Sequence, residues 1–383
     1  MPVAVGAENL FLGRDTKVFI KKGAVIWEIP VLNGYTFQQS TNTSEITLNE
    51  MARANGSTRR GKAVFNDSVS PTEWSFESYA RPFIVNGVHR TTDEVLWANL
   101  FANNPILTTN SDKSLETWSQ AVTFGATKID FDAADSNYVS LGTVDIYFVF
   151  GANTVSSKNY TASGDTTIYM IPNAVVNEAS ITFEVEALTS INWSGMGGTI
   201  QELASFDATT AITGGTTATN NFIRSRFTAL TATSSVSGSS VDYGITLTGG
   251  SITISNNITF LTPEEIGKVN QPFAHVTGTR SVSGSFMCYI DEATNGALDL
   301  YEDILGAVDA DRNVFALNFY VGGKDGANDR PAGPGMQFKM LQAHLEVPTL
   351  NPDDVISLEV NFSALPTTLG ATDEITSVTY VGV

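Results

Sequence analysis

Short segments in which polar and apolar residues alternate recur along the chain, and they restrict its fold more than any other feature. In the segment SITFEVE, residues 180–186, every second side chain is apolar. Successive side chains of a β-strand point to opposite faces of a sheet, so this period of two is typical of strands with one buried face. We therefore expect a mainly β fold.

Two segments have a helical pattern instead. In the first, residues 91–101, Thr91 and Glu94 have the spacing of a capping box. Its apolar stripe consists of Leu96, Trp97, Leu100 and Phe101. The same stripe spacing returns at Leu300, Tyr301, Ile304 and Leu305, and Gly306 follows as a C-terminal stop. We expect one helix in each half of the chain.

Several other blocks also occur in the same order in both halves. Phe76 and Tyr79 match Phe286 and Tyr289, while the segments 146–151 and 168–171 match 317–322 and 338–341. Further matches join 19–22 to 222–225, 32–35 to 248–251, and 183–186 to 358–361. Because an ordered set of repeats indicates a repeated structural unit, the sequence predicts a tandem duplication.

At 383 residues the chain has room for roughly two domains of about 150 residues each. We predict a first β domain at 1–205 with extra strands at about 106–165, a polar linker at 206–221, and a second β domain at 222–383. The linker is placed where Thr, Ala, Gly and Asn dominate and hydrophobic periodicity is lost. The predicted fold is two tandem β-sandwich or barrel domains, each with one flanking α-helix.

The sequence contains no catalytic, metal or cofactor motif. Its histidines, His89, His275 and His344, are scattered, and the single cysteine, Cys288, lies in an apolar run that predicts a buried thiol. No segment approaches the roughly 18–20 apolar residues that a membrane helix needs. We therefore expect a structural protein with no enzymatic activity, no cofactor and no membrane contact.

Charge also limits the partners. The chain has 21 Lys and Arg against 40 Asp and Glu, a net charge of -19. This balance repels phosphate and argues against nucleic-acid binding driven by counterion release. One exception is the segment 51–71, which is rich in Gly, Ser and Asn and carries Arg53, Arg59, Arg60 and Lys62. It is either a solvated loop or a docking loop for acidic surface on a neighbouring subunit.

Four stretches of sequence, taken in order, carry a resemblance to a known family. They are residues 27–37 with 44–46, residues 71–76 with 79–82, residues 171–177 leading to 191–195, and residues 249–252 through 261–263 to 278–284. Together they resemble the major tail tube proteins of long-tailed bacteriophages. The resemblance spans most of the chain, and its specificity comes from the order of the stretches.

The resemblance implies subunits that join side by side into rings, which stack around a tape-measure protein and later conduct DNA without binding it specifically. It implies assembly in the host cytoplasm, a place in the virion tail, and contacts with copies of itself and with sheath, terminator or baseplate proteins. With two similar halves per chain, three chains would close a pseudo-sixfold ring. The basic segment would contact the adjacent ring.

Channel-facing acids are expected where a strand lines the lumen and exposes every second side chain. The candidates are Glu184, Glu186 and Glu359, and they could equally be solvent-facing acids on outer strands. Two other functions stay open: tandem immunoglobulin-like domains of an adhesin, which also have short alternating strands, and a tail terminator or decoration protein.

Overall fold

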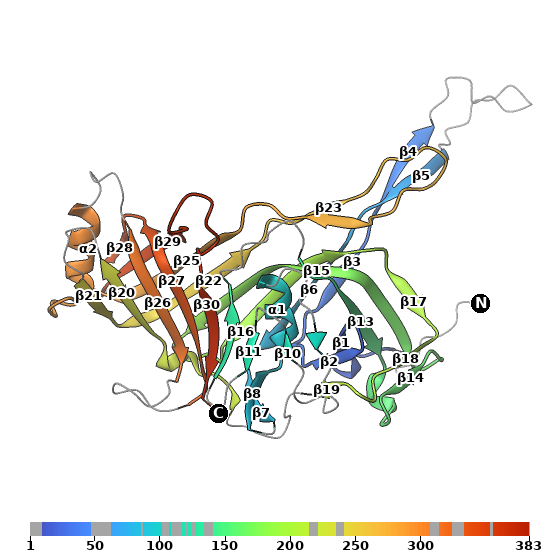
Figure 1. The fold of residues 1–383 in the computed structure, drawn as a ribbon, viewed down its shortest axis with the longest axis horizontal. Coiled ribbons are helices and arrows are strands. Elements are labelled where there is room, and N and C mark those ends of the chain that lie inside the picture. The colour runs from blue at the N-terminus through green and yellow to red at the C-terminus, as the bar shows by residue number, and fades with distance from the viewer. Residues whose placement is uncertain are drawn as a thin grey trace, which may run out of the picture.

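The computed structural model describes residues 10–46, 63–85, 87–101, 107–108, 117–118, 122–124, 128–133, 141–213, 221–234, 241–306, 314–323, 333–352 and 355–382. Two β-rich lobes lie side by side, and a narrow arm projects from them (Figure 1). The predicted mainly β fold with two helices is confirmed.

The elements before residue 214 are β1 (Lys17–Lys22), β2 (Val25–Ile29), β3 (Thr36–Gln38), β4 (Thr41–Ile46), β5 (Ala63–Val69), β6 (Thr72–Tyr79), β7 (Pro82–Val85), β8 (Val88–Thr91), α1 (Glu94–Phe101), β9 (Leu107–Thr108), β10 (Thr117–Trp118), β11 (Val122–Phe124), β12 (Lys128–Asp132), β13 (Val144–Phe150), β14 (Asn159–Thr161), β15 (Thr167–Glu184), β16 (Ser190–Gly197), β17 (Gln201–Leu203), β18 (Ser205–Asp207) and β19 (Ile212–Thr213).

The elements after residue 220 are β20 (Ala229–Ser234), β21 (Val241–Ile245), β22 (Leu247–Ser255), β23 (Thr259–Leu261), β24 (Ala274–Val276), β25 (Ser281–Tyr289), α2 (Ala297–Gly306), β26 (Phe315–Gly322), β27 (Gly335–Leu345), β28 (Thr349–Pro352), β29 (Ile356–Ala364) and β30 (Ser377–Val381).

The two halves contain the same set of antiparallel pairings. In the first half β1 pairs with β2 and β13, β13 with β15, β3 with β6, and β16 with both β6 and β15. In the second half β20 pairs with β21 and β26, β26 with β27, β22 with β25, and β29 with both β25 and β27. Even the bulges correspond: the register shifts between Val144 and Ile146, and again between Phe315 and Leu317.

Four of the predicted block matches do not agree with these pairings. Two are shifted by one residue: 168–171 corresponds to 337–340 instead of 338–341, and 32–35 to 247–250 instead of 248–251. The other two lie in strands that do not correspond. The segment 19–22 lies in β1, whose pairings are reproduced by β20 and not by residues 222–225. Likewise, residues 358–361 lie in β29, whose pairings correspond to those of β16. The segment 183–186, to which they were matched, begins at the end of β15 instead. Short runs of alternating residues look alike in any strand, so sequence similarity alone misplaced these blocks.

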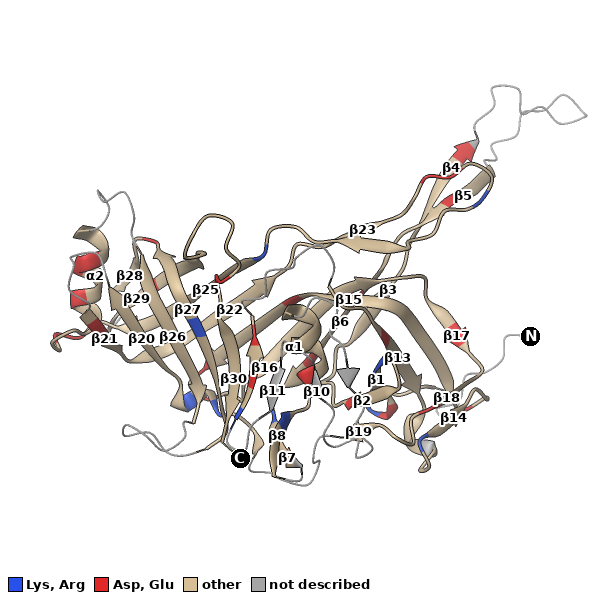
Figure 2. Cartoon of the chain, viewed as in Figure 1, with Lys and Arg blue, Asp and Glu red and all other residues tan. Residues whose placement is uncertain are grey.

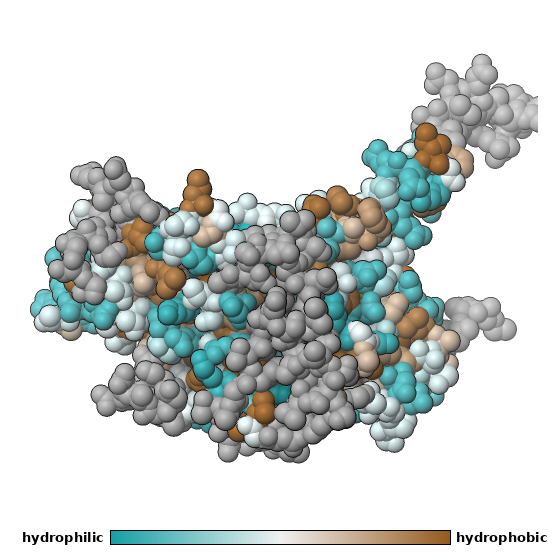
Figure 3. Space-filling model, viewed as in Figure 1, coloured by the Kyte–Doolittle hydropathy of each residue, from teal (hydrophilic) through white to brown (hydrophobic). Residues whose placement is uncertain are grey.

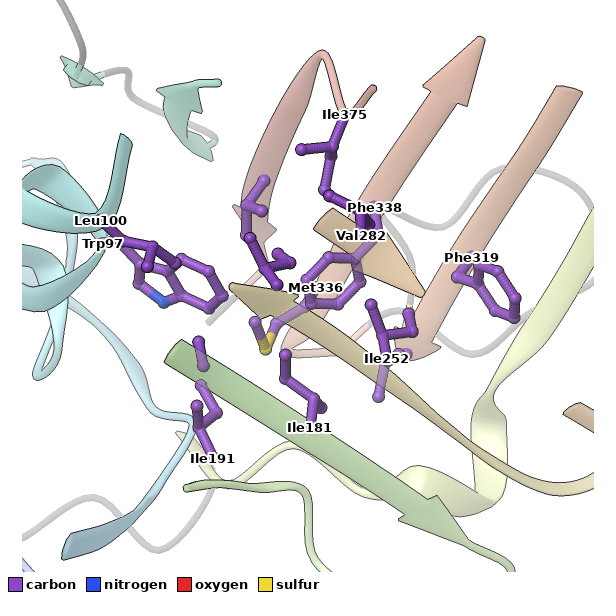
Figure 4. Close-up of a cluster of buried hydrophobic side chains, with 14 of the residues drawn as sticks. Trp97, Leu100, Ile181, Ile191, Ile252, Val282, Phe319, Met336, Phe338 and Ile375 are labelled. Carbon is purple, nitrogen blue, oxygen red and sulfur yellow. The ribbon is translucent and has the colours of Figure 1, made fainter. Parts of the chain in front are cut away.

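The halves are joined by the pairing of β15 with β22, so they share one continuous sheet. The register runs from Glu178 opposite Ser255 to Glu184 opposite Gly249. Side chains from both halves pack on one side of this junction in a common core (Figure 4). Ile181 and Ile191 there come from the first half, and Ile252 and Val282 come from the second. The sheets do not close into a barrel within the described part of the chain.

Extra strands of the first half extend the second. β11 pairs with β12, and β12 pairs with β30, with Lys128 opposite Val381 and Asp132 opposite Ser377. The polar segment after residue 205 also contributes pairings, because β18 pairs with β14 and β19 lies parallel to β2. Phe206 in this segment is buried and stacks on Tyr147 with ring centroids 4.1 Å apart.

Helix α1 begins later than the capping pattern predicts. Thr91 ends β8, and Asp93 precedes the helix, its carbonyl accepting the Leu96 amide at 2.9 Å. Every residue of α1 is buried. The buried Asp93 carboxylate accepts hydrogen bonds from the Tyr380 hydroxyl at 2.7 Å and from the Trp97 indole at 3.1 Å. This network joins the helix of one half to the last strand of the other.

Candidate functional site: a polar sheet face and a projecting arm

One sheet runs through both halves in the hydrogen-bonded order β3, β6, β16, β15, β22, β25, β29, β28. We call it the shared sheet; of β15 it includes only residues 175–184. One of its faces covers the core, where Trp74, Trp193, Ile181, Ile252 and Phe286 are almost fully buried. The residues between them form the opposite face, which we call the polar face.

The polar face contains acids and neutral polar side chains. Its acids are Glu73, Glu77, Glu178, Glu184 and Glu359, which cross-strand partners place on one side of the sheet. None of the strands of the shared sheet contains Lys or Arg over its described residues. The charges can be followed along the chain in Figure 2. The face is therefore negative, with Ser, Thr, Asn and Gln and the exposed Met287 and Tyr289 between and beside the carboxylates.

The predicted channel acids have different positions. Glu184 is exposed at the end of β15, and Glu359 is half-buried in β29, both on the polar face. Glu186 lies in the turn between β15 and β16, where the Ala187 amide donates to the Glu184 carbonyl at 3.3 Å. The strand that was expected to continue to Glu186 therefore ends at Glu184. The two turn residues that follow continue the polar and apolar alternation by chance.

Sequence reasoning missed Glu73, Glu77 and Glu178. The signal was present in β6, where the burial of TEWSFESY alternates strictly between its two faces. Glu178 was hidden by a bulge, because the register of β15 against β16 shifts between Val176 and Glu178. A bulge interrupts the period of two, so the acid cannot be assigned to a face from spacing alone.

The second feature is the arm, formed by β4, β5 and residues 256–280 (Figure 1). β4 and β5 form a hairpin, and the other segment lies beside it through Asn270. The Val69 amide donates to the Asn270 carbonyl at 2.8 Å, and the Asn270 amide donates to the Asp67 carbonyl at 3.2 Å. The arm is therefore built from both halves of the chain.

Apolar side chains are exposed along the arm (Figure 3). Ile266 is fully exposed and Phe273 is 64% exposed. The others are Val64, Phe65, Leu261, Val269 and Val276. Exposed apolar groups gathered in this way mark a contact surface. The predicted docking residues Arg53, Arg59, Arg60 and Lys62 belong to the connection between β4 and β5 and lie outside the described residues.

Neither feature resembles a catalytic centre. Cys288 is buried, as predicted, and burial raises the pKa of its thiol to about 12. The His275 Nε2 accepts the Leu141 amide at 3.1 Å, and burial lowers the pKa of this imidazole. Among the described residues, no group of His, Cys, Asp and Glu could hold a metal ion. Nor does any described helix have the length and hydrophobicity to cross a membrane.

A long negative face and an apolar arm are features of an assembly subunit, and comparison with known proteins identifies the assembly. A family model described as phage tail tube protein matches residues 63–364. The chain belongs to the phage tail tube protein family. It is also similar to the tail tube protein pb6 of Escherichia phage T5, with 30% identity over 383 residues covering 96% of this chain and 75% of the relative.

The family resemblance noted in the sequence is thus confirmed. The tail tube protein is a structural component of the virion tail that assembles with copies of itself into a tube. This assignment favours the predicted tube subunit over the adhesin and over the terminator or decoration protein.

Proposed function

We propose that this tail tube subunit forms closed rings around a channel, that the rings stack, and that the stacked channel conducts DNA during ejection. The polar face carries the proposal. Duplex DNA has one negative charge per about 1.7 Å of its axis, so a lining with carboxylates and without cations repels the duplex and prevents adhesion. Glu73, Glu77, Glu178, Glu184 and Glu359 are the proposed lining acids; Glu186 would lie at the rim.

We also propose that the chain is a tandem duplication and that each half supplies one sector of the ring. The repeated pairings and the equivalent bulges support this division, with the predicted boundary in the segment 206–221. Closed cyclic symmetry then favours three chains in a pseudo-sixfold ring. β12 reaches across to β30, so the two sectors of one chain would not separate as independent domains.

Stacking is assigned to the arm. It projects away from the lobes, and the basic segment with Arg53, Arg59, Arg60 and Lys62 connects its two strands. In this proposal the exposed apolar side chains and these cations contact the next ring. The net charge of -19 gives the cations acidic surface to meet.

The remaining elements of the proposal concern chemistry and partners. The subunit acts without catalysis or cofactor, as expected for a structural family. A tape-measure protein would occupy the channel during assembly in the host cytoplasm. Sheath, terminator and baseplate proteins would contact the outer surface and the ends of the tube.

Electron microscopy of the purified protein, combined with native mass spectrometry, tests this function. We expect stacked tubes with a central channel and rings of three chains. Single rings that never stack would favour a terminator, and a stable monomer would contradict ring formation. Rings of six chains would preserve the tube but exclude two sectors per chain.

A further inference from the structure

The chain contains four Asn–Gly pairs, at residues 33–34, 55–56, 86–87 and 295–296. This dipeptide is chemically labile, because the backbone nitrogen that follows asparagine can attack the asparagine side chain, and glycine has no side chain to obstruct the attack. The structure describes both residues of the first pair and both residues of the last pair. Their surroundings differ, so the two pairs should not react at the same rate.

The first pair, Asn33–Gly34, lies in the turn between β2 and β3, and both residues are exposed. Gly34 has a φ of +106°, and nothing lies within 4 Å of a β-carbon added to it. Within the described part of the chain, no hydrogen bond holds the Asn33 carboxamide or the Gly34 amide. The two groups that would react are therefore able to turn toward each other.

The last pair, Asn295–Gly296, lies in the turn before α2 and is held on several sides. The Gly296 amide donates to the Ala293 carbonyl at 2.8 Å, and the Asn295 amide donates to Asp299 Oδ2 at 2.7 Å. Gly296 is buried, and a β-carbon added to it would overlap the Asp291 carboxylate. The Gly296 nitrogen cannot reach the preceding side chain without breaking these contacts.

We propose that Asn33 is a site of spontaneous modification, at which the side chain deamidates through a cyclic imide formed with the Gly34 nitrogen. In this reaction the Gly34 nitrogen loses its proton and bonds to Cγ of Asn33, while the side-chain nitrogen leaves as ammonia. Water then opens the imide at one of its two carbonyl groups. The product is either aspartate or isoaspartate, in which the main chain runs through Cβ and Cγ of residue 33. No electrons are transferred, and water is the only co-reactant.

Isoaspartate adds one carbon to the main chain of a turn whose two ends are fixed. At one end the Leu32 amide donates to the Glu77 carbonyl in β6 at 2.7 Å. At the other end the Tyr35 hydroxyl donates to Thr16 Oγ1 at 2.7 Å, and the Tyr35 ring stacks on Phe148 with centroids 5.9 Å apart. The extra carbon can be accommodated only if one of these anchors is displaced.

β3 begins directly after this turn and depends on it. It pairs with β6 over a short ladder that runs from Thr36 opposite Ser75 to Gln38 opposite Glu73. Displacement of Tyr35 would disturb the first of these pairs. Isoaspartate at position 33 should therefore loosen β3 and lower the stability of the folded chain. Aspartate keeps the length of the main chain and should leave the pairing intact.

Peptide mapping by mass spectrometry tests the site. The unassembled protein is incubated at pH 8 in heavy-oxygen water, so that each deamidation during the incubation places one heavy oxygen atom in the new carboxylate. A second sample is incubated in urea, where the contacts around the last pair are lost. The test does not depend on tube formation, so its outcome is independent of the proposed function.

We expect the peptide with Asn33 to be converted several-fold faster than the peptide with Asn295 in the folded protein, and both peptides to be converted at similar rates in urea. Equal rates in the folded protein would overturn the structural protection of the last pair. An Asn33 that stays unmodified in the folded protein, while it is converted in urea, would overturn the proposed site.

The effect on β3 is measured by thermal unfolding before and after the incubation. Asn33→Gln is the matched control, because the longer glutamine side chain forms its ring much more slowly. We expect the melting temperature of the unmodified protein to fall as isoaspartate accumulates, and that of Asn33→Gln to stay constant. Freshly prepared Asn33→Asp should melt as the fresh unmodified protein does. An unchanged melting temperature in protein that contains isoaspartate, or an equal loss in fresh Asn33→Asp, would overturn the role of the added carbon.

Discussion

Trp74 and Gly195 lie opposite each other in the pairing of β6 with β16, and a β-carbon on Gly195 would come within 2.6 Å of the Trp74 ring. The equivalent pair in the second half is reversed. There Gly284 lies opposite Phe362, and a β-carbon on Gly284 would come within 2.8 Å of the phenyl ring. Each half thus fills the same space with one large ring over one glycine.

Gly195→Ala should therefore destabilise the subunit strongly. The added methyl group would overlap the Val175 carbonyl oxygen as well as the Trp74 ring, and neither group can move freely. Overpacking of this kind costs about 3 kcal/mol. Gly244→Ala is the control, because nothing lies within 4 Å of its added carbon, and its effect should stay below about 0.5 kcal/mol. Urea unfolding of the unassembled protein measures both.

The reversed glycine and aromatic pairs explain why the similarity between the halves is faint in the sequence, whereas other features could be predicted from it. Strand alternation, both helices and the buried Cys288 follow from local patterns, and these expectations are confirmed. The repeat is faint because equivalent positions exchange large and small residues, as Trp74 and Gly284 do. At this pair each half combines one large ring with one glycine, and no single position reveals that combination.

Long-range pairing was beyond sequence reasoning for another reason. A period of two assigns each side chain to a face but does not say which strand lies beside it. Nothing local in β12 indicates that it pairs with β30, or in β15 that it pairs with β22. The polar face could be predicted only in part, since its acids come from strands far apart in sequence.

The buried Asp93 should make the subunit less stable as the pH rises. Burial raises the pKa of this carboxyl to about 7, well above its ordinary value of 3.8, although Tyr380 and Trp97 donate hydrogen bonds to it. The folded state then binds a proton that the unfolded state has released, so the stabilisation is present at low pH and is lost between about pH 4 and 7.

Asp93→Asn removes this titration while keeping an oxygen that accepts both hydrogen bonds. Thermal unfolding at pH 5 and pH 8 should show a smaller difference in melting temperature for the variant than for the unmodified protein. Glu202→Gln, an exposed change in β17, should leave that difference as it is. An equal difference in all three proteins would contradict a titrating Asp93.

Replacing the acids of the polar face should affect DNA transport without affecting assembly. Glutamine at positions 73, 77, 178, 184 and 359 keeps the shape of the lining and removes its charge, so the duplex is repelled less. We expect normal tubes and slower DNA release from particles that carry the variant. Glu202→Gln is the control outside the polar face. Unchanged release would remove these acids from the lining.

Stacking of rings should depend more on the apolar side chains of the arm than on its cations. An exposed ion pair contributes only about 0.2–1 kcal/mol, whereas burying a side chain such as Ile266 or Phe273 contributes about 1.5–3 kcal/mol. Ile266→Ser/Phe273→Ser should therefore give rings that do not stack, and Arg59→Ala/Arg60→Ala should give tubes that form less readily. Leu369→Ser, a change at a fully exposed leucine outside the arm, is the control.

Salt separates the two contributions, because ions screen exposed pairs and leave apolar burial intact. Tubes of the unmodified protein should persist at 1 M salt when examined by electron microscopy. Removal of residues 55–62 should abolish stacking at any salt concentration, because it shortens the connection between β4 and β5 by half and takes away three of its four predicted docking cations. If 1 M salt dissociates the tubes and the Ile266→Ser/Phe273→Ser variant still stacks, the cations dominate, and the apolar surface of the arm must serve another contact. Normal tubes after the deletion would instead remove residues 55–62 from the stacking interface altogether.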